Sequence, residues 1–376
     1  MDAVTQTWFI HTSSPVQNLE SIEASKFIQS FTGPSVPIRS KFMIWKLDGG
    51  PYGSGVLTTA RRRISKEVVS TCSISQRRLW HENCIYTCSQ IGDTFTAELF
   101  QRKGIFVDLV NSTRIKAESL GITHIYGFPN MNSYPGYVKK LDFNEIPNLQ
   151  LYQFTAILRW DYVSKQVSKV KLVLVQKLLN NTFVNILGAT LIKLWRKSLW
   201  WFLIPPKNYT ITQLTIAAKD LDEFWERMQS HIDTAIIRDS TYLNWRFLRN
   251  PYPYKIWVIR RNQIVVAYFV ILSVPNGNFE DGERSILTDW LYDPTEGRKI
   301  QHTVLRSALK FLDSAGSSSV TAIHSRMATQ ELPFWRAGFI RRKLERPIIV
   351  YGSLQGKRFV STAQNWHLTS SDLDEF

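Results

Sequence analysis

The most constraining feature of this chain is a strand–turn–helix pattern in its first third. Residues 94–100 are rich in β-forming side chains and predict a strand. The basic turn 101–104 follows, and apolar residues then recur at helical spacing over 105–121. A helix that begins at such a turn directs its first backbone N–H groups and the positive end of its dipole at one point. The sequence therefore predicts an anion-binding turn, to which Arg102 and Lys103 add positive charge.

The pattern continues with a strand over 124–128, a polar turn, and a short helix that ends near Phe143. This ordered set resembles the acyl-CoA-binding core of the GNAT acetyltransferase superfamily, whose phosphate loop reads Gln/Arg-x-x-Gly-x-Gly/Ala. The corresponding residues 101–106 read Gln-Arg-Lys-Gly-Ile-Phe, so Phe106 replaces a small residue. Residues 127–141 narrow the resemblance to a two-domain subgroup associated with bacterial surface-polysaccharide genes.

A weak internal repeat indicates two copies of one fold. Trp45 and Trp245 are each followed by a basic residue and, six positions after the Trp, by proline. In the second copy the basic turn is replaced by residues 292–297, in which Asp293 and Glu296 would repel a diphosphate. We expect an α+β chain with two tandem GNAT-like domains, each a mixed, mostly antiparallel sheet flanked by helices. The predicted divisions are an N-terminal domain with the acyl-CoA loop (1–150), a basic, Trp-rich helical connector (151–212) and a C-terminal domain without a cofactor loop (213–376).

The resemblance implies that acetyl-CoA is the co-substrate and that it binds along the turn and the preceding strand. The diphosphate would lie on the N–H groups of the turn, and the pantetheine arm would pair with the strand 94–99. A backbone N–H near Ala97 or Leu99 would polarise the thioester carbonyl, while Phe106 is expected to crowd the phosphate. The predicted cofactor-binding residues are Thr96, Ala97, Leu99, Gln101, Arg102, Lys103, Gly104, Ile105, Phe106, Asn130 and Ser133. Asn130 and Ser133 also suit a simple turn.

Acyl transfer to an amine needs a proton for the departing thiolate. Members of the superfamily often supply it from a tyrosine five residues before the final Phe, but Val138 stands there. Tyr134 is the replacement candidate and Tyr137 the second. Asp93 and Glu98 are the candidate bases, with a surface or turn-stabilising role as the alternative for each.

Charge and cysteine content limit the partners. The formal net charge of +15 favours an anionic partner, such as a nucleotide cofactor, acidic lipid or nucleic acid, or else a solvated basic surface. His81, Cys84 and Cys88 lack the further ligands of a zinc site, so no metal is predicted and the thiols are interpreted as core residues.

The connector and the N-terminus bear on location. No stretch of about 18 residues within 172–204 is free of charge, which argues against a spanning helix. This segment suits either a helix packed between the domains or an amphipathic helix in an anionic membrane interface. Because the first residues lack a signal-peptide pattern, we expect a cytoplasmic chain, with peripheral membrane contact left open.

Three functions fit these features. The first is an acyl-CoA-dependent N-acetyltransferase, acting by direct attack in a ternary complex on a small amine acceptor, an amino sugar by family association. The second is a Fem-like aminoacyl transferase that uses aminoacyl-tRNA, which the positive charge would suit. The third is a catalytically degenerate pair that serves as a binding scaffold. DNA is not expected as a partner.

Overall fold

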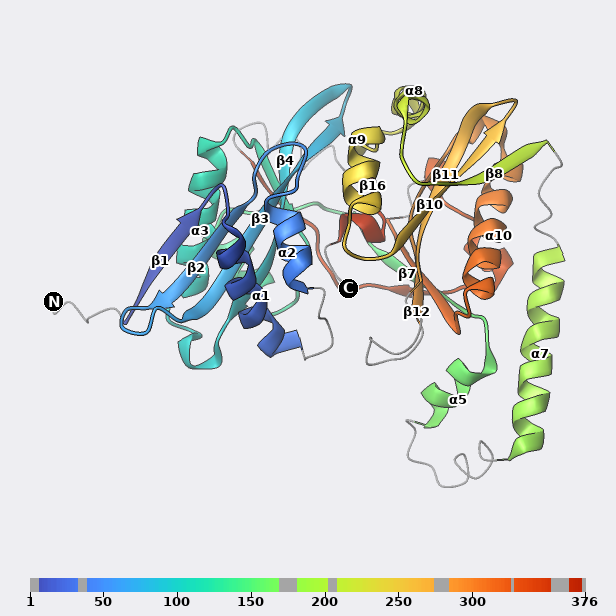
Figure 1. Ribbon diagram of the computed structural model, residues 1–376, viewed down its shortest axis with the longest axis horizontal. Coiled ribbons are helices and arrows are strands. Elements are labelled where there is room, and N and C mark those ends of the chain that lie inside the picture. Colours follow the sequence, from blue (N-terminus) through green and yellow to red (C-terminus); the bar gives the residue numbers. More distant parts are fainter. Residues whose placement is uncertain are drawn as a thin grey trace. The chain divides into compact units, whose positions relative to one another are not determined.

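The computed structural model describes residues 7–32, 39–168, 181–201, 208–273, 284–325, 328–352 and 365–373. The chain forms two compact units, each built on a mixed sheet with flanking helices (Figure 1). The first unit comprises Met1–Gln150, Ile232–Tyr252 and Glu345–Trp366, and the second Leu151–His231, Pro253–Leu344 and His367–Phe376. The predicted α+β class with two mostly antiparallel sheets is confirmed.

The sheet of the first unit runs in the order β1-β2-β3-β4-β5-β15-β6, and β9 pairs with β3. Its strands are β1 (Trp8–Ser13), β2 (Val56–Arg62), β3 (Val68–His81), β4 (Cys84–Thr96), β5 (His124–Gly127), β6 (Asn144–Glu145), β9 (Thr234–Ile236), β15 (Ile349–Gly352) and, at the unit boundary, β16 (Trp366–His367). Its helices are α1 (Asn18–Thr32), α2 (Arg39–Leu47), α3 (Ile105–Ser119), α4 (Tyr134–Lys140) and α9 (Ser240–Leu243).

Both faces of this sheet are covered, as the alternation along β2 requires. Val56 belongs to the core cluster that includes α3, whereas its neighbour Leu57 belongs to the cluster of α1 and α2. Successive strand residues point to opposite faces, so one strand serves two cores. α3 therefore packs across one face of the sheet.

The sheet of the second unit runs β14-β7-β13-β12-β11-β10-β8. Its strands are β7 (Tyr152–Ile157), β8 (Tyr209–Leu214), β10 (Tyr254–Arg261), β11 (Ile264–Ser273), β12 (Arg284–Tyr292), β13 (Ser319–His324) and β14 (Ile340–Lys343). Its helices are α5 (Trp160–Ser168), α7 (Thr182–Trp201), α8 (Lys219–Met228) and α10 (Arg298–Ser314).

Each sheet contains a strand from the opposite half of the sequence. β15, near the C-terminus, lies between β5 and β6 in the first sheet, and β7 lies between β13 and β14 in the second. The sequence division placed 213–376 in one domain, but 232–252 and 345–366 belong to the first unit. The predicted connector contains β7, α5, α7 and part of β8, all in the second unit, while its residues 169–180 and 202–207 lie outside the described residues.

The two tryptophans of the internal repeat meet in one core of the first unit. The rings of Trp45 and Trp245 stack with centroids 4.7 Å apart and planes 15° from parallel. The guanidinium of Arg77 lies 4.4 Å from the Trp245 ring centroid, on an arginine that is 2 % exposed. This buried stack fixes the segment 232–252 to the first unit.

The three cysteines differ in their exposure. Cys72 and Cys88 are buried, but Cys84 is exposed because it begins β4 at the turn from β3, so its interpretation as a core thiol is wrong. Among the described residues, no three His, Cys, Asp or Glu side chains gather as metal ligands would. None of the described helices has the length and apolar content needed to cross a membrane.

Acidification from pH 7 to pH 5 is expected to destabilise the fold through His124 on β5. The side chain is 2 % exposed, and burial, with a smaller contribution from His81, lowers its pKa to about 4. In the unfolded chain this imidazole takes up a proton near pH 6.5. Between pH 6.5 and about pH 4 the unfolded chain therefore binds one proton more than the folded chain, so the free energy of unfolding decreases as the pH is lowered. In urea unfolding, the wild type should lose about 2 kcal/mol more than His124→Gln over this range. Equal losses would contradict the assignment.

Candidate active site

The predicted anion-binding turn lies between β4 and α3 and is open to solvent. A 3₁₀ turn (Glu98–Phe100) follows β4, and residues 101–104 are all exposed. Gly104, directly before α3, has φ of 85°, a left-handed conformation that glycine adopts without strain. The N–H groups of Ile105 and Phe106, which begin α3, have no carbonyl in the helix to bond. The helix predicted from residue 105 is confirmed, and its N-cap residue Gly104 has no side chain to bond to the first turn.

Three cationic side chains surround this turn. The Lys103 Nζ lies 5.3 Å from the Phe100 ring centroid, and the Arg62 guanidinium lies 5.0 Å from the same centroid. Arg102 is exposed and adopts a positive φ of 60°. The sequence did not predict this contact, because nothing local relates Arg62 to Phe100. The fold thus brings a cation from the end of β2 to the two of the turn itself, although Arg62 is also paired with Glu67 (3.4 Å).

Phe106 does not crowd this turn, and that prediction is wrong. Its ring packs edge-on against Tyr137 at 5.0 Å between centroids. A Cβ added to Gly136 would lie 2.6 Å from the Phe106 ring, so the ring occupies the space that this glycine leaves on α4. The large side chain of Phe106 thus joins α3 to α4, and its backbone N–H stays in the first turn of α3.

β4 separates from β5 before reaching the turn. The parallel ladder joins Cys88–Gln90 to His124–Tyr126, and among the described strands only β3 accompanies β4 from there to Thr96. Ala97 donates its N–H to the Val69 carbonyl (2.9 Å), so Thr96, one residue earlier, points its backbone groups away from β3. The Thr96 carbonyl accepts a bond from Gln101 Nε2 (3.1 Å). The free edge of β4 at Thr96 can therefore bond to the amides of an extended ligand, since the side-chain amide of Gln101 already bonds to it.

The predicted strand 94–99 is too long, which changes three assignments. β4 ends at Thr96, and Glu98 and Leu99 lie in the 3₁₀ turn. The Ala97 N–H is taken by Val69, so its assignment as a donor to the thioester carbonyl is wrong. Leu99 is 76 % exposed and Glu98 is also exposed, and both lie in the turn beyond the end of β4 rather than on the strand that was expected to carry the thioester.

Asp93 lies at a bulge in β4, opposite the shift in register between Thr71 and Ser73. Its φ is 51°, and its carboxylate accepts bonds from Lys46 Nζ (2.8 Å) and Ser73 Oγ (2.7 Å). The Lys46 side chain is completely buried and that of Asp93 is 14 % exposed. This buried ion pair anchors the bulge to α2. The Asp93 carboxylate, which was predicted as a candidate base, is therefore bonded to Lys46.

The two candidate tyrosines of α4 lie in different environments. Tyr137 is buried among aromatic rings and its hydroxyl lies 3.2 Å from Thr94 Oγ1, while burial strongly raises its pKa. Tyr134 is half-buried and donates a hydrogen bond to Glu145. That bond, with some burial, raises the pKa of Tyr134 above the ordinary value for a tyrosine, which is itself protonated at neutral pH. Of the two, Tyr134 is the hydroxyl that solvent or a substrate can reach.

Asn130 and Ser133 form the turn that begins α4. The Asn130 Oδ1 accepts bonds from Asn132 N (3.1 Å), Ser133 N (3.0 Å) and Ser133 Oγ (3.1 Å). Both side chains are therefore engaged within the turn, which agrees with the turn role considered for them. Their binding of a cofactor stays a prediction.

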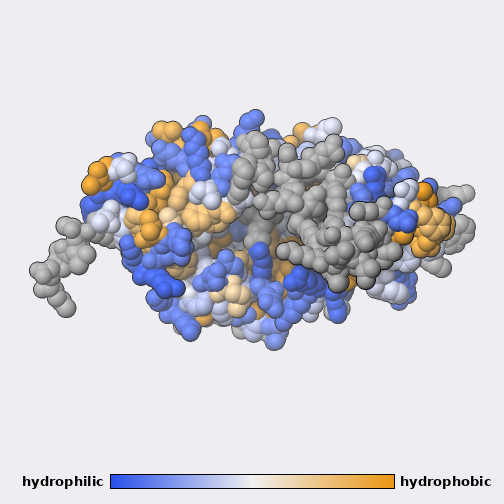
Figure 2. Space-filling model, turned by 90° about the horizontal axis from the view of Figure 1, so that it is seen from below, coloured by the Kyte–Doolittle hydropathy of each residue, from blue (hydrophilic) through white to orange (hydrophobic). Residues whose placement is uncertain are grey.

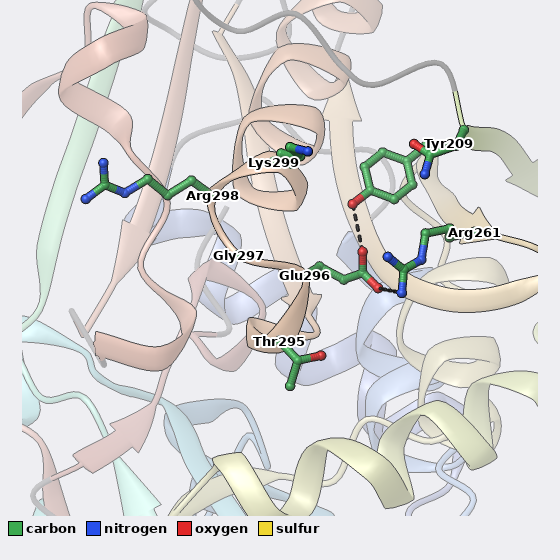
Figure 3. Close-up of a pocket in the computed structure, with 8 residues that line it drawn as sticks. Tyr209, Arg261, Thr295, Glu296, Gly297, Arg298 and Lys299 are labelled. Carbon is green, nitrogen blue, oxygen red and sulfur yellow. Dashed lines mark hydrogen bonds and ion pairs between the residues drawn. The ribbon is translucent and has the colours of Figure 1, made fainter.

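The second unit has a corresponding turn before α10, with different chemistry (Figure 3). A cavity of about 410 Å³ is lined there by Asn208, Tyr209, Arg261, Thr295, Glu296, Gly297, Arg298 and Lys299. The Glu296 carboxylate accepts bonds from Tyr209 Oη (2.8 Å) and Arg261 (2.8 Å), as Figure 3 shows. Asp293 caps the turn through Thr295 N (2.9 Å). The acidic residues are thus fixed beside this turn by internal bonds.

The edge of β12, the counterpart of β4, is occupied by the protein itself. Tyr292 N donates to Gln330 Oε1 (3.0 Å), and Gln330 Nε2 donates to the Tyr292 carbonyl (2.9 Å). Gln330 is completely buried. A buried carboxamide that satisfies both backbone groups leaves no place there for a pantetheine amide.

No protein-family model matches the chain, and no curated protein matches it. Solved structures are similar in fold. N-myristoyltransferase of Saccharomyces cerevisiae with bound myristoyl-CoA is 11 % identical with a TM-score of 0.62, covering 93 % of this chain and 84 % of that one. A probable N-acyltransferase of Enterococcus faecalis V583 is 11 % identical with a TM-score of 0.56, covering 92 % and 73 %. A GCN5-related N-acetyltransferase of Anabaena variabilis is 10 % identical with a TM-score of 0.53, covering 91 % and 72 %.

These likenesses extend over both units, because each covers at least nine tenths of this chain. At such identities they establish the architecture and leave the chemistry to the residues of the site. The chain has a tandem GNAT-like fold.

Proposed function

We propose that the first unit binds an acyl-CoA and transfers its acyl group to an amine. The observation that supports this most strongly is the exposed cationic turn at the start of α3, adjacent to the edge of β4 that no described strand continues. The diphosphate would accept bonds from the N–H groups of Gly104, Ile105 and Phe106, with Arg102 and Lys103 beside it. The pantetheine amides would replace the Gln101 carboxamide on Thr96.

The chemical step is direct attack within a ternary complex. The amine nitrogen forms a bond to the thioester carbonyl carbon, and the carbon–sulfur bond breaks. Tyr134 gives its proton to the departing sulfur and regains one, through solvent, from the acylated nitrogen. This route gives no base role to Asp93, which is paired with Lys46, or to Glu98, which lies at the phosphate end.

We propose an acetyl group as the acyl group and an amino sugar of a surface glycan as the acceptor, in the cytoplasm beside an anionic membrane. The neighbours named above are N-acyl, N-myristoyl and N-acetyltransferases, which supports an acyl-CoA and an amine in general. The amino sugar rests on the resemblance of residues 127–141 alone. A thiol-release assay with acetyl-CoA and a panel of amino sugars, amino acids and peptides tests it, and release only with a peptide amine would refute the sugar acceptor.

Replacing Tyr134 with phenylalanine is expected to lower turnover about a hundredfold, because the proton donor is lost. Acetyl-CoA affinity should be unchanged, since the bond to Glu145 that is lost with it involves none of the residues assigned to the cofactor. Steady-state kinetics and calorimetric titration measure the two effects separately. Tyr137→Phe is the matched control: it removes the bond to Thr94 and should cost about 1 kcal/mol of stability with little effect on turnover. Unchanged turnover in Tyr134→Phe would remove Tyr134 from this role.

A further inference from the structure

α7 in the second unit has one face packed on its own unit. A Cβ added to Gly188 would lie 2.4 Å from the Trp160 ring, and Trp160 Nε1 donates to Asn185 Oδ1 (2.8 Å). Two turns further on, Arg196 Nη1 bonds to Asp313 Oδ1 (2.9 Å) and to the Leu158 carbonyl (2.7 Å). Asn185, Gly188 and Arg196 lie on the same side of the helix, and this side packs against the rest of the unit.

The opposite face of α7 exposes large apolar side chains in a continuous stripe. Its members are Phe183 (71 % exposed), Ile186 (61 %), Leu187 (47 %), Leu191 (57 %) and Leu194 (59 %). Their spacing of three and four residues places them on one side of the helix. α7 is the light-green helix drawn at the right of Figure 1, and Figure 2 shows hydrophobic residues at the right of its view. Soluble proteins seldom expose a contiguous apolar surface of this kind without a partner.

The charges on α7 are of one sign. Its twenty residues include no Asp or Glu, and Lys193 and Lys197 are exposed beside the stripe. Arg196, by contrast, is engaged by Asp313 on the inward side. A membrane with acidic headgroups offers a hydrocarbon interior to the apolar stripe and a negatively charged surface to the exposed lysines beside it. The net charge of +15 acts in the same direction.

We propose that α7 is a membrane-surface helix that lies in the plane of an anionic lipid bilayer, with the stripe inserted at the headgroup boundary and the two lysines on the headgroups. A helix of this kind needs no spanning length, because only its outer face enters the lipid. The contact uses none of the residues placed in acyl transfer.

Sedimentation of the full-length protein with vesicles tests this proposal. The vesicles contain phosphatidylcholine with or without about one third phosphatidylglycerol, which supplies the anionic charge. We expect the wild type to sediment with the anionic vesicles. Lys193→Ala with Lys197→Ala should weaken binding about fivefold for each lysine removed, and Leu187→Glu with Leu191→Glu should weaken it at least about tenfold.

Ile264→Glu is the matched control, since Ile264 is also 59 % exposed but lies on β11. It should bind vesicles as the wild type does, and all variants should keep the wild-type circular dichroism and acetyl-CoA affinity. The proposal is overturned if the wild type stays in the supernatant, or if the stripe variant binds as well as Ile264→Glu. It is also overturned if the wild type is a dimer that the stripe variant dissociates without any change in vesicle binding.

Discussion

Replacing Gly104 with aspartate is expected to weaken acetyl-CoA binding about a hundredfold, because it adds a negative charge where the diphosphate would lie. Aspartate tolerates the left-handed conformation of this position (φ 85°) better than most residues, and nothing lies within 4 Å of an added Cβ. The loss should therefore come from charge rather than from crowding. Isothermal titration calorimetry with acetyl-CoA measures it.

Gly121→Asp provides the control within the same helix. Gly121 follows α3 at its other end, with φ of 75° and no atom within 4 Å of an added Cβ. This variant introduces the same side chain into a similar conformation but at the negative end of the helix dipole, so it should destabilise the fold more than Gly104→Asp while acetyl-CoA affinity stays at the wild-type value. Equal affinity losses in the two variants would mean that the start of α3 has no special relation to the ligand.

Replacing Lys46 with alanine is expected to destabilise the protein by about 3–5 kcal/mol, since it leaves the Asp93 carboxylate without its buried partner. The ammonium is completely buried and lies 2.8 Å from Asp93 Oδ2. The bulge in β4 should loosen at the same time, so turnover should fall in the fraction that remains folded. Chemical denaturation and steady-state kinetics measure the two losses.

A double variant separates charge from packing at this place. Lys46→Met with Asp93→Asn removes both charges, and asparagine suits the positive φ of 51° at position 93. We expect it to recover most of the stability, to within about 2 kcal/mol of the wild type. If the double variant is as unstable as Lys46→Ala, the ion pair is not the source of the loss.

The parts of the site that depend on local chemistry could be predicted from the sequence. The beginning of α3 at Ile105 and the exposed basic turn before it follow from helical spacing and from Gly104. The end of β4 was missed because Phe100, a β-forming residue, continues the strand pattern across Glu98 and Leu99. Strand patterns cannot distinguish such a continuation from a 3₁₀ turn.

The parts that depend on distant contacts could not be predicted. Asp93 and Lys46 are 47 residues apart, and only the packing of α2 under the bulge brings them together. Phe106 turns toward α4 because Gly136 leaves room for its ring. The exchange of β7 and β15 between the sheets is likewise a matter of tertiary pairing, since their short strand patterns do not specify partners.

Acetyl-CoA binding by two matched charge-reversed variants tests the central claim most directly. Arg102→Glu with Lys103→Glu reverses the exposed cations before α3, and Arg298→Glu with Lys299→Glu does the same at the start of α10. By calorimetry, we expect one saturable site in the wild type, its loss in the first variant and its retention in the second. A wild type that binds no acetyl-CoA, or binding that is lost only in the α10 variant, would contradict the assignment of the site to the first unit.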